Sequence, residues 1–198
     1  MFEYFLSLIL LTLRSPREAA GKVLKLDLDR RSLWTVLTLT AVISSLMSEL
    51  TLVFVPTVMV AEQSPLPSSP IVLALVIWAL LTITALASHF IGRAFDGEGS
   101  FDESLLATIW MQVVLLAMQV VQIGLFLVAP PIALMFGWAG ALYMFGVFLI
   151  FVQVLHGFKS LGGVVAGAVI GFIGIMLSLG VILAVISVIF GVELAADV

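Results

Sequence analysis

Cysteine is absent from all 198 residues, which excludes disulfide bonds, thiol catalysis and cysteine-based zinc sites and leaves the redox compartment undetermined. Charge is also scarce, because Asp, Glu, Lys and Arg together make up 10% of the chain. With a formal net charge of −4 and no basic field across the chain, nucleic acid is not an expected partner. The chain as a whole is 63% hydrophobic, well above the usual share in a soluble domain.

Long apolar runs dominate this sequence. Five of them are long enough to cross a bilayer as helices, which takes about 20 residues; they cover residues 33–60, 71–91, 104–129, 132–155 and 163–190. Each run is continuous and does not alternate as a barrel strand would, so helices are predicted. The expected fold is an all-α polytopic membrane bundle of five transmembrane helices with an N-terminal interfacial amphipathic helix. Residues 1–32 form the N-terminal segment, 33–190 the bundle and 191–198 a short external tail.

Every cation falls on one side of this predicted topology. Six precede the first run, Arg93 follows the second and Lys159 follows the fourth. The six are Arg14, Arg17, Lys22, Lys25, Arg30 and Arg31. Because cytoplasmic flanks are rich in Lys and Arg, the pattern predicts a cytoplasmic N-terminus and an external C-terminus.

Two short segments precede the first span. Residues 4–13 are apolar but too short to cross the membrane, and without a basic start they do not read as a signal peptide, so we expect a retained segment in the interface or packed against the bundle. Next, Ser15-Pro16-Arg17-Glu18 is typical of a helix start with a capping box.

The basic helix after Ser15 is expected to lie on the cytoplasmic leaflet. Its apolar face would carry Ala20, Val23, Leu24 and Leu28. Its cations Arg17, Lys22 and Lys25 would contact anionic lipid headgroups at about 1 kcal/mol each. The alternative is that these cations act only as a topology signal.

Polar side chains inside the spans are candidates for function. Glu49 lies near the outer boundary of the first span, where an ionisable group is a candidate by default. Gln112, Gln119 and Gln122 share one stripe of the third span, which we expect to face the bundle interior. Interhelical hydrogen bonds are the favoured interpretation of this stripe, and the lining of a polar path is the alternative.

Small residues form two ridges, each with a spacing of four. One comprises Ala133, Gly137 and Ala141, and the other Gly163, Gly167 and Gly171. Such ridges allow helix backbones to approach closely. Packing within the bundle is expected, and the second ridge is equally suited to a homodimer interface.

The connection between the second and third spans is the most distinctive stretch. Its glycines predict a turn, and Ser100 with Glu103 predicts a capping box that starts the third span. Charged and imidazole side chains gather at the same predicted face: His89, Arg93, Asp96, Glu98, His156 and Lys159. A divalent metal on the two histidines and acidic residues is an alternative interpretation, but the spacing matches no metal motif, and no metal or other cofactor is expected.

The stretch Gly97-Glu98-Gly99-Ser100-Phe101 resembles the glycine-rich "G-x-G-S-F" element of the Ypt-interacting protein (YIP) domain family, bacterial type. Residues 11–20 are similar to the N-terminal segment of such members. The resemblance implies five spans with the N-terminus inside and placement in a bacterial cytoplasmic (inner) membrane. Eukaryotic relatives are linked to vesicle traffic and small GTPases, a role that the resemblance does not extend to bacterial members.

Two functional hypotheses follow. The first is an integral membrane protein without catalytic activity that organises the membrane or recruits lipid or an unknown protein partner through its cytoplasmic face. It depends on the basic N-terminal helix, the packing ridges and the lack of a nucleophile with a matching base. The second is a small transporter or channel with a glutamine-lined path, which lacks a mid-membrane charge and a detectable inverted repeat.

Overall fold

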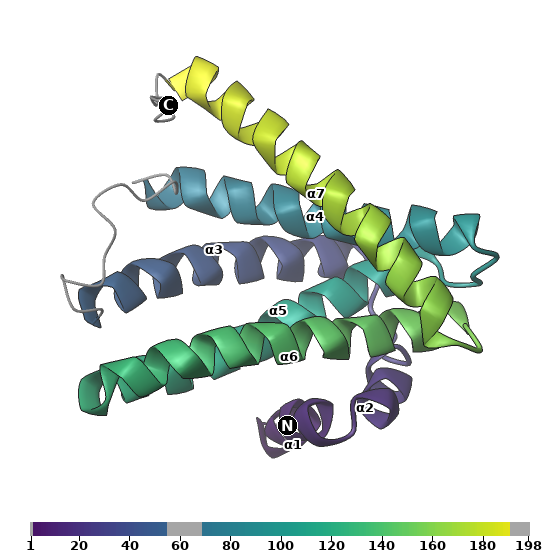
Figure 1. The fold of residues 1–198 in the computed structure, drawn as a ribbon, viewed down its shortest axis with the longest axis horizontal. Helices are drawn as coiled ribbons and strands as arrows, with labels where there is room; N and C mark the ends of the chain where they lie inside the picture. The colour runs from purple at the N-terminus through teal and green to yellow at the C-terminus, as the bar shows by residue number, and fades with distance from the viewer. Residues whose placement is uncertain (1, 55–68, 191–198) are drawn as a thin grey trace.

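A computed structural model describes residues 2–54 and 69–190, all of whose regular structure is helical (Figure 1). The helices are α1 (Phe2–Arg14), α2 (Pro16–Val23), α3 (Arg30–Phe54), α4 (Pro70–Ala94), α5 (Phe101–Val128), α6 (Pro130–His156) and α7 (Leu161–Phe190). Within the described ranges, five helices, α3 to α7, are long and apolar enough to cross a membrane. The predicted fold class is therefore confirmed.

The observed helices begin and end slightly outside the predicted spans. α4 continues to Ala94 and α6 to His156, while the predicted end of the first span, 55–60, lies outside the described residues, as do most of the loop before Pro70 and the tail 191–198. Pro130 and Pro131, which fall between the third and fourth predicted spans and which we expected to form a tight turn, instead belong to the first turn of α6. Proline fits there because the first helical N–H groups need no intrahelical partner. Only Ala129 separates α5 from α6.

Helix α5 is the centre of the bundle. It packs against α3, α4 and α6, and α7 packs on α4 and more lightly on α6 (Figure 1). Residues 104–111 of α5 are all buried, so this part of the helix is enclosed on every side. The connections 95–100 and 157–160 lie beside this enclosed part, as does the start of α3. We call this the cationic end, because Arg30, Arg31, Arg93 and Lys159 are all located there.

Helix α2 packs against α5 and α6 through a face of small apolar side chains. Ala19, Ala20 and Val23 are fully buried there. The helix ends at Val23, so the prediction that Leu28 continues its apolar face is wrong; Leu28 lies beyond the helix and is exposed. Pro16 occupies the first turn as predicted, but the Ser15 side chain makes no capping bond. Ser15 instead continues directly from α1, since its N–H donates to the Leu11 carbonyl.

Helix α1 is held against the bundle by two long-range hydrogen bonds. The indole Nε1 of Trp110 donates to Thr12 Oγ1 at 2.9 Å, and the Tyr143 hydroxyl donates to the Leu13 carbonyl at 2.6 Å. Phe5 packs edge-on against Trp110. Trp110 and Tyr143 lie nine and thirteen residues from the cationic ends of their helices, or about 14 and 20 Å at the helical rise.

The position of α1 tests one of the two placements that the sequence left open, packing against the bundle. Figure 1 shows α1 running across the bundle, beneath α6, and not along it. Together with the two hydrogen bonds, this confirms packing against the bundle. The outer face remains apolar and exposed, with Tyr4, Leu6 and Leu10 each more than 40% accessible.

We predict that Thr12→Val loosens α1. The substitution keeps the side-chain volume but leaves the buried Trp110 N–H without its acceptor, which costs about 1–3 kcal/mol. Trypsin cleavage after the exposed Arg14 is expected to accelerate several-fold, as followed by gel or mass spectrometry. Ser7→Ala is the matched control, because that hydroxyl only bonds the nearby Tyr4 carbonyl on the exposed surface. Equal cleavage rates in all three proteins would contradict this anchoring.

Candidate functional site

The site at the cationic end is built around the buried imidazole of His156. This residue is the last of α6 and is 2% accessible. The backbone N–H of Gly99 lies 3.2 Å from its Nδ1, and its Nε2 lies 3.0 Å from the Ser88 carbonyl of α4. An N–H can only donate and a carbonyl can only accept, so the ring is neutral with its proton on Nε2. One side chain thereby connects the ends of α4, α5 and α6.

Three glycines leave the space that the His156 ring fills. A Cβ on Gly92 would lie 2.2 Å from the ring, on Gly97 2.6 Å and on Gly99 2.8 Å. We call Gly92, Gly97 and Gly99 the glycine seat. The turn between them places Asp96 at φ 61°, a left-handed conformation that Asp tolerates better than most residues. The glycine spacing of the sequence is therefore explained by the close approach of an aromatic ring.

His89 and the start of α5 complete the glycine seat from the other side. His89 Nδ1 lies 3.2 Å from the Gly99 carbonyl, and its ring packs edge-on against Phe101. The predicted capping box is confirmed, since Ser100 Oγ accepts from the Glu103 N–H while the Glu103 carboxylate accepts from the Ser100 N–H. The two histidines thus contact Gly99 from both sides, one at its N–H and the other at its carbonyl.

The charged candidates surround the glycine seat without forming a polar cluster. Arg93, Asp96, Glu98 and Lys159 are all exposed. In residues 2–54 and 69–190, no group of three His, Asp or Glu side chains is placed to hold a metal ion. A metal at His156 would have to displace either the Gly99 N–H or the Ser88 carbonyl. The geometry accounts for both histidines as structural groups.

Gln153 extends this arrangement to α2. It is 5% accessible, donates from Nε2 to the Phe158 carbonyl and accepts a 2.7 Å hydrogen bond at Oε1 from Arg17. The α6 terminus is closed by Gly157 at φ 68°, a left-handed position suited to glycine. Arg17, which we expected to contact lipid headgroups, is thus engaged by the protein itself.

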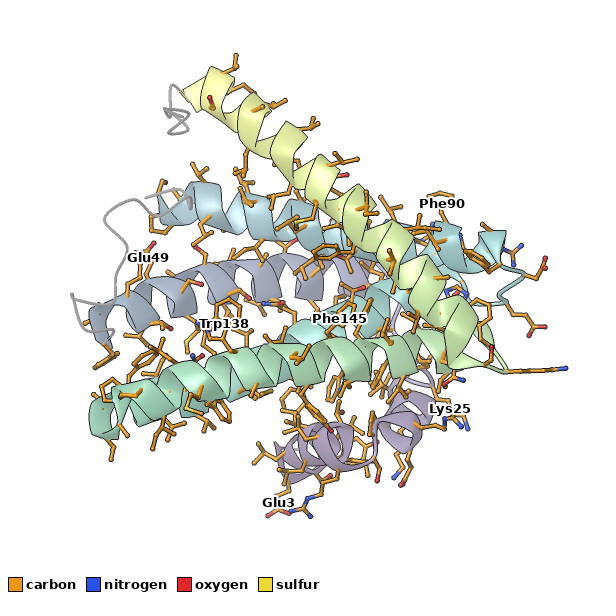
Figure 2. All side chains as sticks on the ribbon, in the orientation of Figure 1. Glu3, Lys25, Glu49, Phe90, Trp138 and Phe145 are labelled. Atoms are coloured by element: carbon orange, nitrogen blue, oxygen red, sulfur yellow. The ribbon has the colours of Figure 1, made fainter. Side chains whose placement is uncertain are left out.

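The other two cations proposed to contact lipid remain on the surface. Lys22 is exposed and pairs with Glu18 one turn earlier at 2.8 Å, and this hydrogen bond raises the pKa of Lys22. Lys25 is exposed in the connection after α2 (Figure 2). Both side chains are therefore accessible, and their contact with anionic headgroups stays a prediction.

The three glutamines of α5 donate hydrogen bonds to neighbouring helices. Gln112 Nε2 donates to Ser44 Oγ and Gln119 Nε2 to Thr51 Oγ1, both on α3; Gln122 Nε2 donates to the Ala133 carbonyl of α6. These bonds bear out the favoured interpretation of the stripe, because amides in an apolar medium are used to join helices. Glu49 is half-buried on α3, towards the end opposite the cationic one (Figure 2).

Part of each ridge of small residues packs against a neighbouring helix. Ala133 is fully buried, and a Cβ at Gly137 would lie 2.3 Å from Gln122 of α5. On α7, Gly167 and Gly171 face Ile91 of α4. A Cβ added at Gly167 would lie 2.9 Å from the Ile91 side chain, and one added at Gly171 would lie 3.2 Å from it. Gly163 has no neighbouring heavy atom within 4 Å of such a Cβ.

Several residues of the site were missed from the sequence. Gln153 carries the same signal as the glutamine stripe, an amide within an apolar helix, and could have been found by that rule. The role of Ser88 could not, because His156 bonds its backbone carbonyl. Thr12, Trp110 and Tyr143 also carry no local signal, since their partners are about 100 residues or more away in the chain.

We predict that Gly99→Ala destabilises the fold by about 1–3 kcal/mol, the usual cost of overpacking. The added methyl group would lie within 2.9 Å of both His156 and Leu155. The measurement is thermal unfolding in detergent, with Gly146→Ala of α6 as the control, because nothing lies within 4 Å of a Cβ there. Gly99→Ala combined with His156→Ala should cost less than the sum of the two single changes. Additive costs would show that the ring and Gly99 are not in contact.

Gln112→Leu is expected to cost about 0.6 kcal/mol, the typical value of an interhelical hydrogen bond in a membrane. Ser44→Ala should have a similar effect. The double variant should lose less stability than the sum of the two single variants, because both substitutions remove the same hydrogen bond. Denaturant unfolding of all four proteins in mixed micelles measures this coupling. A coupling energy of zero would mean that the amide and the hydroxyl do not interact.

Comparison with protein families identifies a known domain in this chain. The family model described as "Yip1 domain" matches residues 10–192, which is most of the chain and includes the glycine seat and all five long helices. Neither the curated proteins nor the solved structures include a significant match. The chain belongs to the Yip1 domain family and is a multi-pass membrane protein.

Proposed function

We propose that this protein is a non-enzymatic organiser of the membrane, acting through its cationic end on the lipids of one leaflet and on an unknown protein partner. The observation that carries the proposal is the docking of α1 and α2. Two long-range hydrogen bonds hold α1 beside one half of the bundle, with Tyr4, Leu6 and Leu10 exposed. In a bilayer these side chains would occupy space in one leaflet only.

The distribution of charge supports an orientation for this element. Every Lys and Arg of the chain precedes α3 or lies at the cationic end. By the positive-inside rule this end faces the cytoplasm, so the N-terminus is inside and the C-terminus outside. We place the protein in the cytoplasmic (inner) membrane of a bacterium, in line with the bacterial type of the G-x-G-S-F element.

Lipid recruitment is assigned to the outward face of α2 and the connection that follows it. Lys22 and Lys25 are exposed there, and the apolar face of α2 is already used against α5 and α6. Each exposed cation near an anionic membrane surface contributes about 1 kcal/mol. The exposed side chains of Asp96 and Glu98 offer a separate contact for a protein partner.

The transporter alternative is weaker on this geometry. A continuous polar path needs free amides, but all three glutamines donate to α3 or α6. Gln119 and Gln122 do line a small hollow between α5 and α6, of about 170 Å³, whereas Gln112 is not part of its lining. The amides therefore join helices and do not line a path through the bundle.

The lipid part of the proposal predicts a change in lipid selectivity. In the variant Lys22→Gln/Lys25→Gln, the preference for spin-labelled phosphatidylglycerol over phosphatidylcholine should fall several-fold, since about 1 kcal/mol per cation is lost. Electron paramagnetic resonance of the protein in vesicles measures the motionally restricted fraction of each lipid. Glu49→Gln, at the opposite end of the bundle, is the charge-changing control and should retain the preference. An unchanged preference in the double variant would refute recruitment through α2.

A further inference from the structure

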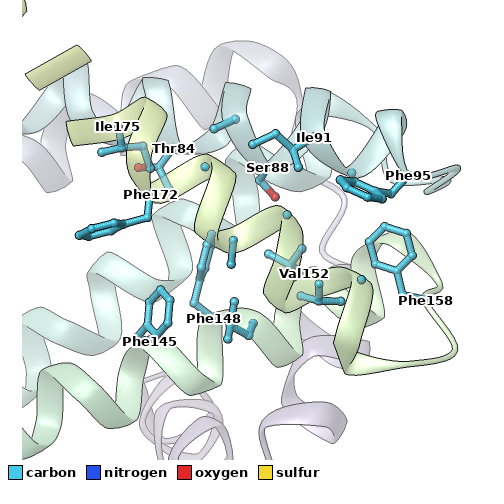
Figure 3. A pocket seen from close by; sticks show the side chains of 18 residues that line it. Thr84, Ser88, Ile91, Phe95, Phe145, Phe148, Val152, Phe158, Phe172 and Ile175 are labelled. Atoms are coloured by element: carbon cyan, nitrogen blue, oxygen red, sulfur yellow. The ribbon is translucent and has the colours of Figure 1, made fainter. Parts of the chain in front are cut away.

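An apolar cavity of about 100 Å³ lies between α4, α6 and α7, next to the cationic end (Figure 3). Its walls include Phe148 and Val152 of α6, Ile91 of α4, Phe95 directly after α4, and Ile175 of α7. Apolar cavities of this size stay dry and accept hydrocarbon. Chemically, the cavity is suited to an alkyl chain.

A groove on the membrane-facing side adjoins the cavity. A second hollow between α6 and α7 shares four lining residues with it, Phe145, Leu149, Ala168 and Phe172. Phe172 is 55% accessible, and the adjoining Val165 and Val169 are also exposed. Since these helices are surrounded by lipid in a membrane, the medium that reaches the groove is acyl chain. We call the cavity and this second hollow together the α6–α7 groove.

A polar atom is present in the otherwise apolar wall. Ser88 Oγ is buried and has no hydrogen-bond partner within the described part of the chain. Figure 3 shows its side chain pointing from α4 towards the space bordered by α7. Most other Ser and Thr hydroxyls of α3 and α4 bond a carbonyl one turn earlier, as Thr84 does. An acceptor from a bound molecule would satisfy the Ser88 hydroxyl.

Two cations are close in the chain to residues that line the α6–α7 groove. Arg93 is two residues from the lining residue Phe95, and Lys159 directly follows the lining residue Phe158. Ser88 precedes Arg93 by five residues, about 8 Å along α4. The headgroup region of a bilayer leaflet is about 5–8 Å deep, so Ser88 lies near the border between headgroups and hydrocarbon when Arg93 is at the phosphates. Asp96 and Glu98, like Arg93 and Lys159, are not among the lining residues of the groove.

We propose that the α6–α7 groove binds one acyl chain of an anionic glycerophospholipid. The phosphate lies between Arg93 and Lys159, and the ester carbonyl accepts a hydrogen bond from Ser88 Oγ. The acyl chain runs past Phe148 towards Phe172. This site is separate from the surface of α2, and it holds a single lipid in a defined position. A second copy of the chain is a poorer occupant, because Gly167 and Gly171 of the α7 ridge already pack against Ile91.

The test uses a substitution that fills the mouth without a clash. Gly163 lines the cavity, yet no heavy atom lies within 4 Å of a Cβ there, so Gly163→Leu places its side chain in open space. Gly174→Leu is the matched control on the same helix, since it also has open space but does not line the cavity. Thermal unfolding shows whether both variants fold as the unmodified chain does.

The measurement is native mass spectrometry of the full chain released from nanodiscs containing equal amounts of phosphatidylglycerol and phosphatidylcholine with identical acyl chains. One retained phosphatidylglycerol is expected for the unmodified chain and Gly174→Leu, with at least a fivefold loss in Gly163→Leu. Lys159→Gln, an exposed change that should not affect folding, is expected to remove the preference for phosphatidylglycerol.

Three results would overturn the proposal. Equal retention by Gly163→Leu and the unmodified chain would show that the lipid is elsewhere. Equal retention of both lipids by the unmodified chain would refute the anionic headgroup, and a dimer lost on Gly163→Leu would identify a second copy as the occupant. Lys22→Gln/Lys25→Gln should keep the bound lipid, so this site and the proposed function can fail independently.

Discussion

The imidazole of His156 is the interaction on which the cationic end depends. It joins three helices through two hydrogen bonds, one from the Gly99 N–H and one to the Ser88 carbonyl. Both partners are backbone groups, so their identity is set by the path of the chain and not by side-chain chemistry. The arrangement is possible only because Gly92, Gly97 and Gly99 have no Cβ. Without this ring, the Gly99 N–H would lose its acceptor in a buried position, which is costly away from water.

Polar contacts between helices recur throughout the bundle, which is consistent with an apolar surrounding. In lipid the hydrophobic effect does not drive helices to associate, so their association depends on close packing and hydrogen bonds. Hydrogen bonds join α1 and α2 to the bundle through Trp110, Tyr143 and Gln153. Hydrogen bonds from the glutamines of α5 join this helix to α3 and α6. By contrast, α7 contacts its neighbours mainly through apolar and small residues, and it borders both hollows of the α6–α7 groove.

Much of the fold was predictable from the sequence, because length and continuity of apolar runs determine which segments can cross a bilayer. The capping box at Ser100 and the inward-facing glutamines followed from local spacing in the same way. The glycine seat did not, since nothing near Gly97 or Gly99 indicates a ring contributed by His156, 57 residues after Gly99. Arg17 was assigned to lipid for a similar reason: its partner Gln153 is distant in the sequence.

The single residue between α5 and α6 limits how these two helices can move relative to each other. Ala129 alone separates two helices of 28 and 27 residues, and the Gln122 amide bonds to Ala133 just beyond this link. A link of one residue cannot stretch, so the joined ends of α5 and α6 stay together while the fold is intact. Relative motion of the two helices is therefore a change of angle about this link and not a sliding of one helix along the other.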